Sequence, residues 1–223
     1  MTAGRLVTGR GVSLARRWRG GMLLWGLLAC GVPARGAAQT TEQLAREALE
    51  HAKAGGHVAW DSARPLTWSD FRARPHAGLF KAAETVSTVT YLIGCLGQEA
   101  RFTVLTTFST MESWVRPDVR ADPAASAAML RHERTHFDLT ELFGRELRRA
   151  LGAADGLCPH DLARARALFD SLDTASRQLQ DRYDRETAHG THGEQQAAWS
   201  AWVQAWLATP VTLEAHAAGA AGR

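Results

Sequence analysis

The segment between Asp122 and Gly152 places the strongest constraint on the fold of this 223-residue chain. Asp122 followed by Pro123 favours the start of a helix, because aspartate can cap the first free amides and proline is tolerated in the first turn. The pattern predicts one helix from Pro123 to about Leu151, with Gly152 at its end. Apolar residues flank the middle of this segment, so we expect a core helix around which the other elements pack.

Two strand segments precede this helix. Residues 84–94 are rich in β-branched side chains, and residues 101–109 alternate Phe and Val with Thr. Residues 94–97 have the composition of a turn between them. The pattern predicts an antiparallel pair that continues into residues 113–115. A further short strand is expected near residues 66–68.

Three further helices are expected. A capping-box pattern, Thr40 with Gln43, opens a short amphipathic helix. A second long helix starts near Pro159 and ends before Gly190. A last helix spans about residues 194–208, and the spacing of its tryptophans is more typical of core packing than of a ligand platform.

The order of these elements predicts an α+β domain over residues 57–208. A small antiparallel sheet is followed in it by two long helices and a C-terminal helix. Residues 39–56 form an N-terminal helix or linker, and residues 209–223 form a disordered tail.

Residues 1–38 have the layout of a signal peptide. They contain six arginines and no acidic residue, and an apolar run at 21–32 follows the arginine-rich stretch. A spanning helix needs ~20 apolar residues, so the run is too short, and small residues place the cleavage after Ala38. Three alternatives stay open: an uncleaved membrane anchor, a twin-arginine signal at Arg16-Arg17, and a lipid anchor at Cys30, where Leu-Leu-Ala-Cys resembles a lipoprotein cleavage site.

The charge balance changes once this segment is set aside. The whole chain has 26 Lys and Arg against 23 Asp and Glu, a formal charge of +3, and a pI of about 9.1. Removing the six arginines leaves 20 against 23, a charge of −3. No basic surplus then remains to support nucleic-acid binding. We expect a periplasmic or extracellular protein without a transmembrane span in its mature form, and less readily a lipoprotein.

The cysteines agree with export. Cys95 and Cys158 are the pair that remains after cleavage at Ala38. An even pair in an exported chain predicts one disulfide, and two buried free thiols are the alternative.

The sequence His132-Glu133-Arg134-Thr135-His136 lies in the middle of the long predicted helix. Histidines four residues apart share one helical face and can converge on one metal ion. A glutamate directly after the first histidine stands beside that ion. It can accept a proton from a water molecule that the ion activates. The pattern predicts one zinc ion, with Glu133 as the catalytic base, whereas solvated residues on an exposed helix are the alternative.

A catalytic zinc site of this kind needs a third protein ligand. The second long helix runs back beside the first, so its C-terminal end can supply that ligand. His189 is the first choice, Asp184 the second and His192 the third. Tyr183 could donate a hydrogen bond to the developing oxyanion, or it could be a core tyrosine of the apolar stripe.

Other residues could support the site. Asp138 and Thr140 could accept the second N–H of a ligating histidine, although Asp138 could instead be a solvated helix residue. The chain near Trp114 could form an edge strand that pairs with an extended substrate.

Four segments together resemble the successive landmarks of a bacterial family. Its members carry a domain of unknown function and are commonly described as predicted secreted zinc-dependent proteases. The resemblance covers about residues 60–205, and the segments are 66–71, 113–115, 132–141 and 183–190. It implies a zincin-like fold, a zinc ion on His132 and His136, and a catalytic Glu133. His189 matches the Thr-x-His-Gly element of the family.

Three functions follow from these patterns. The first is a secreted or periplasmic zinc metallopeptidase that acts on a peptide or protein substrate. The second is a non-catalytic metal-binding envelope protein that binds a partner through its C-terminal tryptophan face. The third is a zinc hydrolase for other amide bonds, such as those of peptidoglycan stems. Glu133 favours hydrolysis over binding alone, because a structural zinc site is more often closed by four protein ligands.

Overall fold

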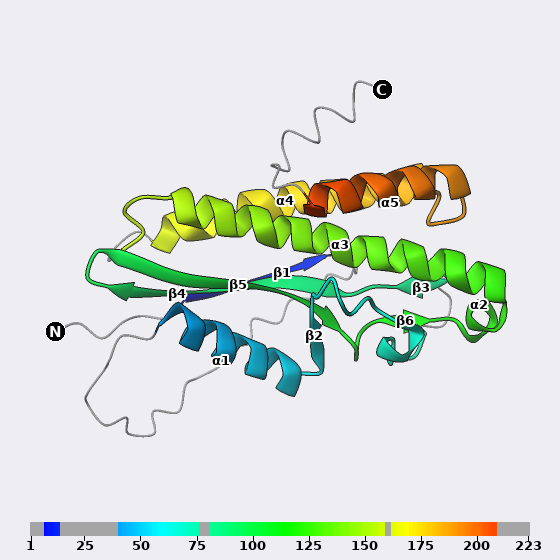
Figure 1. The fold of residues 1–223 in the computed structure, drawn as a ribbon, viewed down its shortest axis with the longest axis horizontal. Coiled ribbons are helices and arrows are strands. Elements are labelled where there is room, and N and C mark those ends of the chain that lie inside the picture. Colours follow the sequence, from blue (N-terminus) through cyan, green and yellow to red (C-terminus); the bar gives the residue numbers. More distant parts are fainter. Residues whose placement is uncertain (1–6, 14–39, 76–80, 159–161, 209–223) are drawn as a thin grey trace.

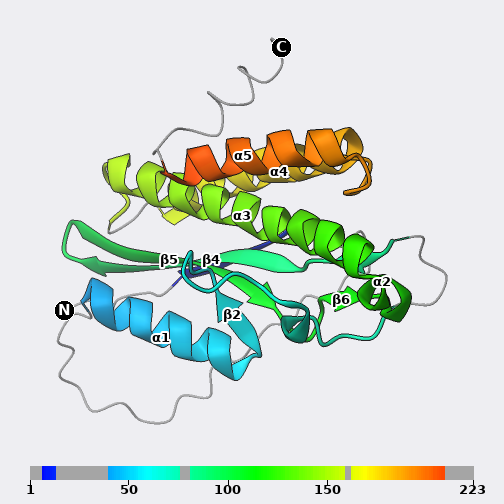
Figure 2. The ribbon, with the colours of Figure 1, turned by 45° about the vertical axis from the view of Figure 1, so that its right-hand side comes forward.

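The computed structural model describes residues 7–13, 40–75, 81–158 and 162–208. A four-stranded antiparallel sheet lies between helices on its two faces (Figure 1). Helix α1 (Thr41–Ala54) covers one face, and α3 (Pro123–Ala153), α4 (Leu162–Glu186) and α5 (Gly193–Ala208) lie on the other. The same two layers of helices are visible after rotation (Figure 2). The mixed α and β class expected from the sequence is confirmed.

The centre of the sheet is the predicted hairpin. Strands β4 (Ser87–Leu96) and β5 (Glu99–Ser109) pair antiparallel, with Thr88 opposite Thr107. The turn lies one or two residues later than expected, where Gly97 adopts φ +60°. Val89, Tyr91 and Ile93 alternate along β4 and are fully buried against the helical layer, as their period of two predicts.

Two strands that the sequence did not predict complete this sheet, in the order β1-β4-β5-β2. Strand β2 (His57–Ala59) pairs with β5, and β1 (Val7–Ser13) pairs with the outer edge of β4. Strand β1 falls inside the predicted signal peptide. The rest of that segment, Cys30 included, lies outside the described residues, as does the predicted disordered tail at 209–223.

A second sheet has two strands, β3 (Ala83–Glu84) and β6 (Trp114–Val115). The predicted extension of the hairpin through Trp114 is therefore found here, paired with β3. The strand expected at residues 66–68 is wrong, because Trp68–Asp70 form a 3-10 helix. The Asp70 carboxylate accepts hydrogen bonds from both the amide and the hydroxyl of Thr67, which holds this turn closed.

The helices follow their predicted bounds closely. Asp122 caps α3 by accepting from two backbone amides, and Thr40 forms the expected capping box on α1. A short helix, α2 (Pro117–Ala121), precedes α3. The first residue described in α4 is Leu162, a little after the predicted start, and α5 begins at Gly193.

The main core lies between the sheet and the helices α3, α4 and α5. The α5 tryptophans Trp199 and Trp206 belong to this core, as their spacing predicted. Cys95 in β4 and Cys158 after α3 form the predicted disulfide, with Cα atoms 5.6 Å apart. Within the described part of the chain, no helix is both long and apolar enough to cross a membrane.

Candidate metal centre

His132 and His136 lie one turn apart on α3, with their rings directed to one point. Their Nε2 atoms are 3.1 Å apart, and the ring planes are nearly perpendicular at 86°. His132 is buried and His136 is half-buried. The four-residue spacing therefore places both imidazoles on one helical face, as the sequence predicted.

Asp184 on α4 meets both histidines. Its Oδ1 lies 3.1 Å from His132 Nε2 and 2.9 Å from His136 Nε2. Among the described residues, these three side chains form the group of His, Cys, Asp and Glu that could hold a metal ion, with ligand atoms within 4.8 Å of one another. The second of the three choices for a third ligand is thus the one that the structure brings to the histidines.

His189 takes a different place. Its side chain is 66% exposed, and its Nδ1 lies 3.5 Å from Asp184 Oδ2, the oxygen turned away from the other two histidines. Helix α4 ends at Glu186, and Ala188 and His189 adopt positive φ values of 46° and 53°. This left-handed turn takes His189 off the helical face that carries Asp184.

His192, the third choice, stands just before α5. Its Nδ1 lies 3.4 Å from the amide of Gln195, a contact typical of the residue that caps a helix. The structure therefore gives His192 a place at the start of α5 and not beside the other two histidines.

Two buried glutamines contact the Nδ1 atoms of His132 and His136, the ring nitrogens that do not contact Asp184. Gln180 Oε1 lies 2.6 Å from His136 Nδ1, and Gln196 Oε1 lies 3.0 Å from His132 Nδ1. The amide nitrogen of Gln180 donates to the backbone carbonyl of His136, which can only accept. The Gln180 oxygen must therefore face Nδ1, so that Nδ1 carries the proton and, in the neutral ring, Nε2 keeps its lone pair. That tautomer is the one that binds a metal through Nε2.

Glu133 lies beside this group and is only 3% exposed. Its Oε2 is buried and has no hydrogen-bond partner among the residues that the structure describes. A buried carboxylate oxygen without a donor is costly, so its position calls for a chemical explanation. The backbone around Glu133 is fixed, since its carbonyl accepts from Thr85 Oγ1 at 3.2 Å.

A small cavity of about 40 Å³ opens onto these side chains. Its walls come from α3, from Asp184 and His189, and from the chain segment Lys81–Thr85, which includes β3. The strand beside the site is thus β3, and the Trp114 segment lies behind it as the pairing partner of β3. The Trp114 segment is an edge strand of this two-stranded sheet, but its partner β3 is the strand that lines the cavity.

The charges of the site are strongly coupled. Burial disfavours a charged ring, but the hydrogen bond and the negative charge of Asp184 outweigh it and raise the pKa of His136. Burial likewise disfavours the Asp184 carboxylate, yet the hydrogen bonds with His132 and His136 hold the pKa of Asp184 well below its usual range. Asp184 is therefore an anion at neutral pH, the form that binds a cation.

Tyr183 belongs to the core. Its ring stacks on His132 with centroids 4.7 Å apart, and its side chain is fully buried. Its hydroxyl lies 2.7 Å from Gln196 Oε1, and burial raises the pKa of Tyr183. The hydroxyl thus faces the supporting glutamine behind the histidine, which matches the core alternative better than the predicted role toward an oxyanion.

Thr140 takes part in the site through another residue. Its hydroxyl accepts from Gln180 Nε2 at 3.2 Å and lies 2.7 Å from Ser87 Oγ. It therefore supports the glutamine that holds His136 and does not accept directly from the ring.

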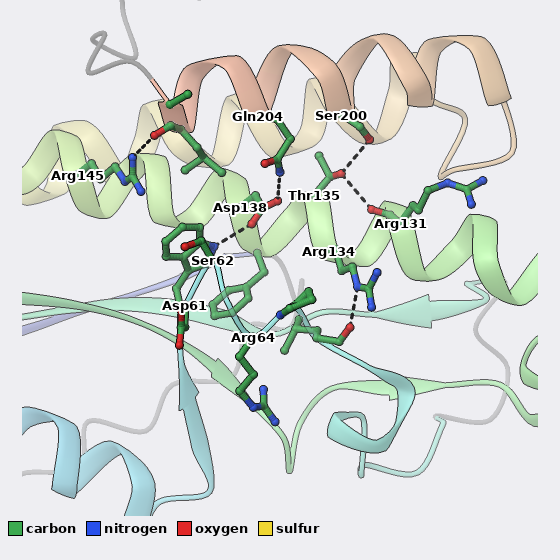
Figure 3. Close-up of a pocket in the computed structure, with 16 residues that line it drawn as sticks. Asp61, Ser62, Arg64, Arg131, Arg134, Thr135, Asp138, Arg145, Ser200 and Gln204 are labelled. Carbon is green, nitrogen blue, oxygen red and sulfur yellow. Dashed lines mark hydrogen bonds between the residues drawn. The ribbon is translucent and has the colours of Figure 1, made fainter.

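The prediction that Asp138 supports a histidine is wrong. Asp138 lies two residues after His136, about 200° around the helix, so its side chain points away from the metal-site face. Its two oxygens accept from Trp60 Nε1 and Gln204 Nε2, each at 2.8 Å. Asp138 faces a groove of about 540 Å³ between α3, the C-terminal half of α5 and the 60–66 loop (Figure 3). This larger hollow is separate from the group of His132, His136 and Asp184.

Three supporting residues were not found from the sequence. Gln180 lies four residues before Asp184, so the spacing along α4 could have indicated it. Gln196 comes from a different helix and leaves no such pattern. Gly190 has φ +82°, and a Cβ on it would lie 2.8 Å from Cβ and Cγ of His132. The turn after α4 therefore packs directly against a ring of the site, which only glycine allows.

Comparisons with known proteins give one family. A model described as "Bacterial protein of unknown function (DUF922)" matches residues 32–190. This stretch contains β2 to β6, α1 to α4 and the turn at Gly190, but not α5. No curated protein and no solved structure matches the chain.

Proposed function

The chain belongs to the DUF922 family of bacterial proteins of unknown function, and we propose that it is an exported zinc-dependent metallopeptidase. The observation that carries this proposal is the position of Glu133. Its buried carboxylate oxygen has no hydrogen-bond partner in the described part of the chain and stands beside two histidines and an aspartate that could share one cation. A site that only stored a metal would have no use for such a group.

The donor set suits zinc. Two imidazole nitrogens and one carboxylate oxygen give three protein ligands, the number found in catalytic zinc sites. When bound, the ion would supply Lewis acidity that lowers the pKa of water and polarises a carbonyl group. Asp184 would take the place of third ligand, ahead of His189 and His192.

The protein's own groups would then move the protons. Glu133 would accept a proton from the attacking water and return it to the leaving amine. His132 and His136 would keep their Nε2 atoms free, because Gln196 and Gln180 hold the Nδ1 protons. Strand β3 lines the cavity and would lie beside an extended substrate chain. The disulfide agrees with export into an oxidising compartment.

The experiment compares wild type with Glu133→Gln, on zinc content and on cleavage of an unbiased peptide library. We expect about one zinc per chain in both proteins, because Glu133 is not a ligand. Cleavage by Glu133→Gln should fall by at least about 100-fold, the contribution typical of a general base. Glu112→Gln, at an exposed position, is the matched control and should cleave like wild type.

Two results would overturn the proposal. If wild type grown with zinc contained no zinc, the proposal that the site binds this metal would be wrong. If wild type and Glu133→Gln cleaved peptides at the same rate, Glu133 would not be the general base. Zinc binding without cleavage in either protein would support the non-catalytic alternative, for which the exposed groove beside Trp199 and Trp202 is the place to look for a partner.

A further inference from the structure

Helix α5 meets α3 through a row of polar side chains. Gln196, Ser200 and Gln204 are spaced by four residues, so they share one face of α5. We call these three residues the α5 polar row. Figure 3 shows Ser200 and Gln204 reaching toward α3 along one side of the groove.

Each member of the row has a partner on α3. Gln204 Nε2 donates to Asp138 at 2.8 Å, and Ser200 Oγ lies 3.3 Å from Thr135 Oγ1. Gln196 is the member that reaches the metal site, with its Oε1 3.0 Å from His132 Nδ1. The row thus connects the groove with the buried histidine.

Gln196 is held by contacts on both ends of its amide. Its Nε2 donates to Ser200 Oγ at 3.0 Å, and its Oε1 also accepts from the Tyr183 hydroxyl at 2.7 Å. The residue is 3% exposed. The Thr135 hydroxyl donates to the Arg131 carbonyl at 3.0 Å, so Ser200 donates to Thr135 and accepts from the Gln196 amide nitrogen. The Gln196 oxygen, which can only accept, is then the end that faces His132.

Packing alone does not account for this arrangement. Helix α5 already docks on the core through Trp199, Val203 and Trp206, which are all buried. Burying an amide beside them costs free energy unless its hydrogen bonds are satisfied, and an apolar residue would avoid that cost. The amide is therefore best explained by what it does to the histidine.

We propose that Gln196 is a positioning residue that orients His132 and sets its tautomer, so that α5 completes the metal centre. The inference rests on the metal site of the proposed function and adds an element that lies outside the matched family region of residues 32–190. His136 is supported by Gln180 on α4, which lies inside the matched region. His132 is supported by Gln196 on α5, which follows that region.

The test measures zinc affinity of the full chain by competition with a chromophoric chelator. Gln196→Leu should weaken zinc binding by about 10- to 100-fold, the range for loss of an outer hydrogen bond to a ligating histidine. Gln196→Glu keeps an acceptor oxygen at the same place and should stay within about threefold of wild type on that scale. Gln204→Leu is the matched control, because it removes the Asp138 contact of the same row without touching His132, and should also bind like wild type.

A second readout needs no metal. In the metal-free protein the Asp184 carboxylate, 3.1 Å from Nε2, competes with Gln196 for the ring proton. The ¹⁵N NMR signals of neutral His132 should therefore show a share of the protons on Nδ1 in wild type and Gln196→Glu. In Gln196→Leu the proton should move in part to Nε2. The same share of Nδ1 protonation in wild type and Gln196→Leu, or equal zinc affinity in the two proteins, would overturn the positioning role. Absence of zinc binding in wild type would instead count against the proposed function, while the NMR comparison still decides the role of Gln196.

Discussion

Asp184 and His189 are only five residues apart, yet the structure gives them different relations to the histidine pair. Asp184 lies in the last turn of α4, and its Oδ1 lies about equally far from both rings. His189 follows the end of the helix and is mostly exposed. We therefore propose Asp184, and not His189, as the third ligand.

Asp184→Asn tests this assignment, because it keeps the shape of the side chain and removes its charge. We expect zinc affinity to fall by at least about tenfold, since even outer partners of metal ligands contribute 10- to 100-fold. His189→Ala should bind zinc with an affinity within about twofold of the wild-type value. Metal content and chelator competition check both variants, and zinc loss from His189→Ala alone would restore His189 as the ligand.

The sequence could indicate what kind of chemistry this site suits better than which residues form it. The spacing of His132 and His136 on a helix defines one face without any knowledge of the fold. The third ligand depends on where α4 ends and how the chain turns after it. The chain leaves α4 through a left-handed turn at Ala188 and His189, and Gly190 of this turn packs against His132 of α3. Because that contact joins residues far apart in the sequence, no local pattern shows it.

At the scale of elements, the turn after α4 connects α4 to α5 and packs against His132 of α3. Thr187 is fully buried, and its hydroxyl donates to the Tyr183 carbonyl while accepting from the Gly190 amide. Two non-glycine residues with positive φ cost about 1–2 kcal/mol each. The turn keeps this conformation because Thr187 and Gly190 tie it to the site.

Gly190→Ala should disturb the turn and the metal site together. The added Cβ would meet the His132 side chain at 2.8 Å, in addition to the strain of φ +82°. We expect the free energy of unfolding to fall by about 2–4 kcal/mol, from left-handed strain and overpacking combined. Zinc affinity should fall with it.

The matched control is Gly97→Ala in the β4–β5 turn. Its φ is +60°, but nothing lies within 4 Å of the added Cβ. Chemical denaturation should show a loss of only about 1–2 kcal/mol, with zinc affinity unchanged. Equal effects of the two variants on zinc would show that the contact with His132 does not matter.

Elements with a strong local pattern were predictable, and elements that depend on distant partners were not. The hairpin alternates over many residues, and α3 has a clear cap at Asp122. Strands β2 and β3 have three and two residues and exist only because β5 and β6 pair with them. The segment at Thr67 suggested a strand, but capping by Asp70 bends it into a 3-10 turn.

At the scale of the whole molecule, the candidate metal site lies near the middle of α3, and the disulfide lies beyond the C-terminal end of this helix. His136 and Ala153 are separated by about 25 Å along the helix, at 1.5 Å per residue. The disulfide joins the end of β4 to the connection after α3. It therefore stabilises the end of the fold that is far from the candidate metal site.

Replacing both Cys95 and Cys158 by alanine should lower stability and leave the site intact. The bond spans 63 residues, and closing a loop of that size contributes about 2–4 kcal/mol. Denaturation should show this loss, while zinc content and cleavage stay at the wild-type level under native conditions. A parallel loss of zinc would mean that the two ends are coupled.

Strand β1 covers the outer edge of β4 along its whole register, from Ser87 to Ile93. Uncovered strand edges present rows of backbone donors and acceptors that can pair with another chain. If export removes residues 1–38, β4 loses β1 as its pairing partner and its outer edge becomes open. Maturation would then alter how the molecules associate with one another, in addition to where they reside.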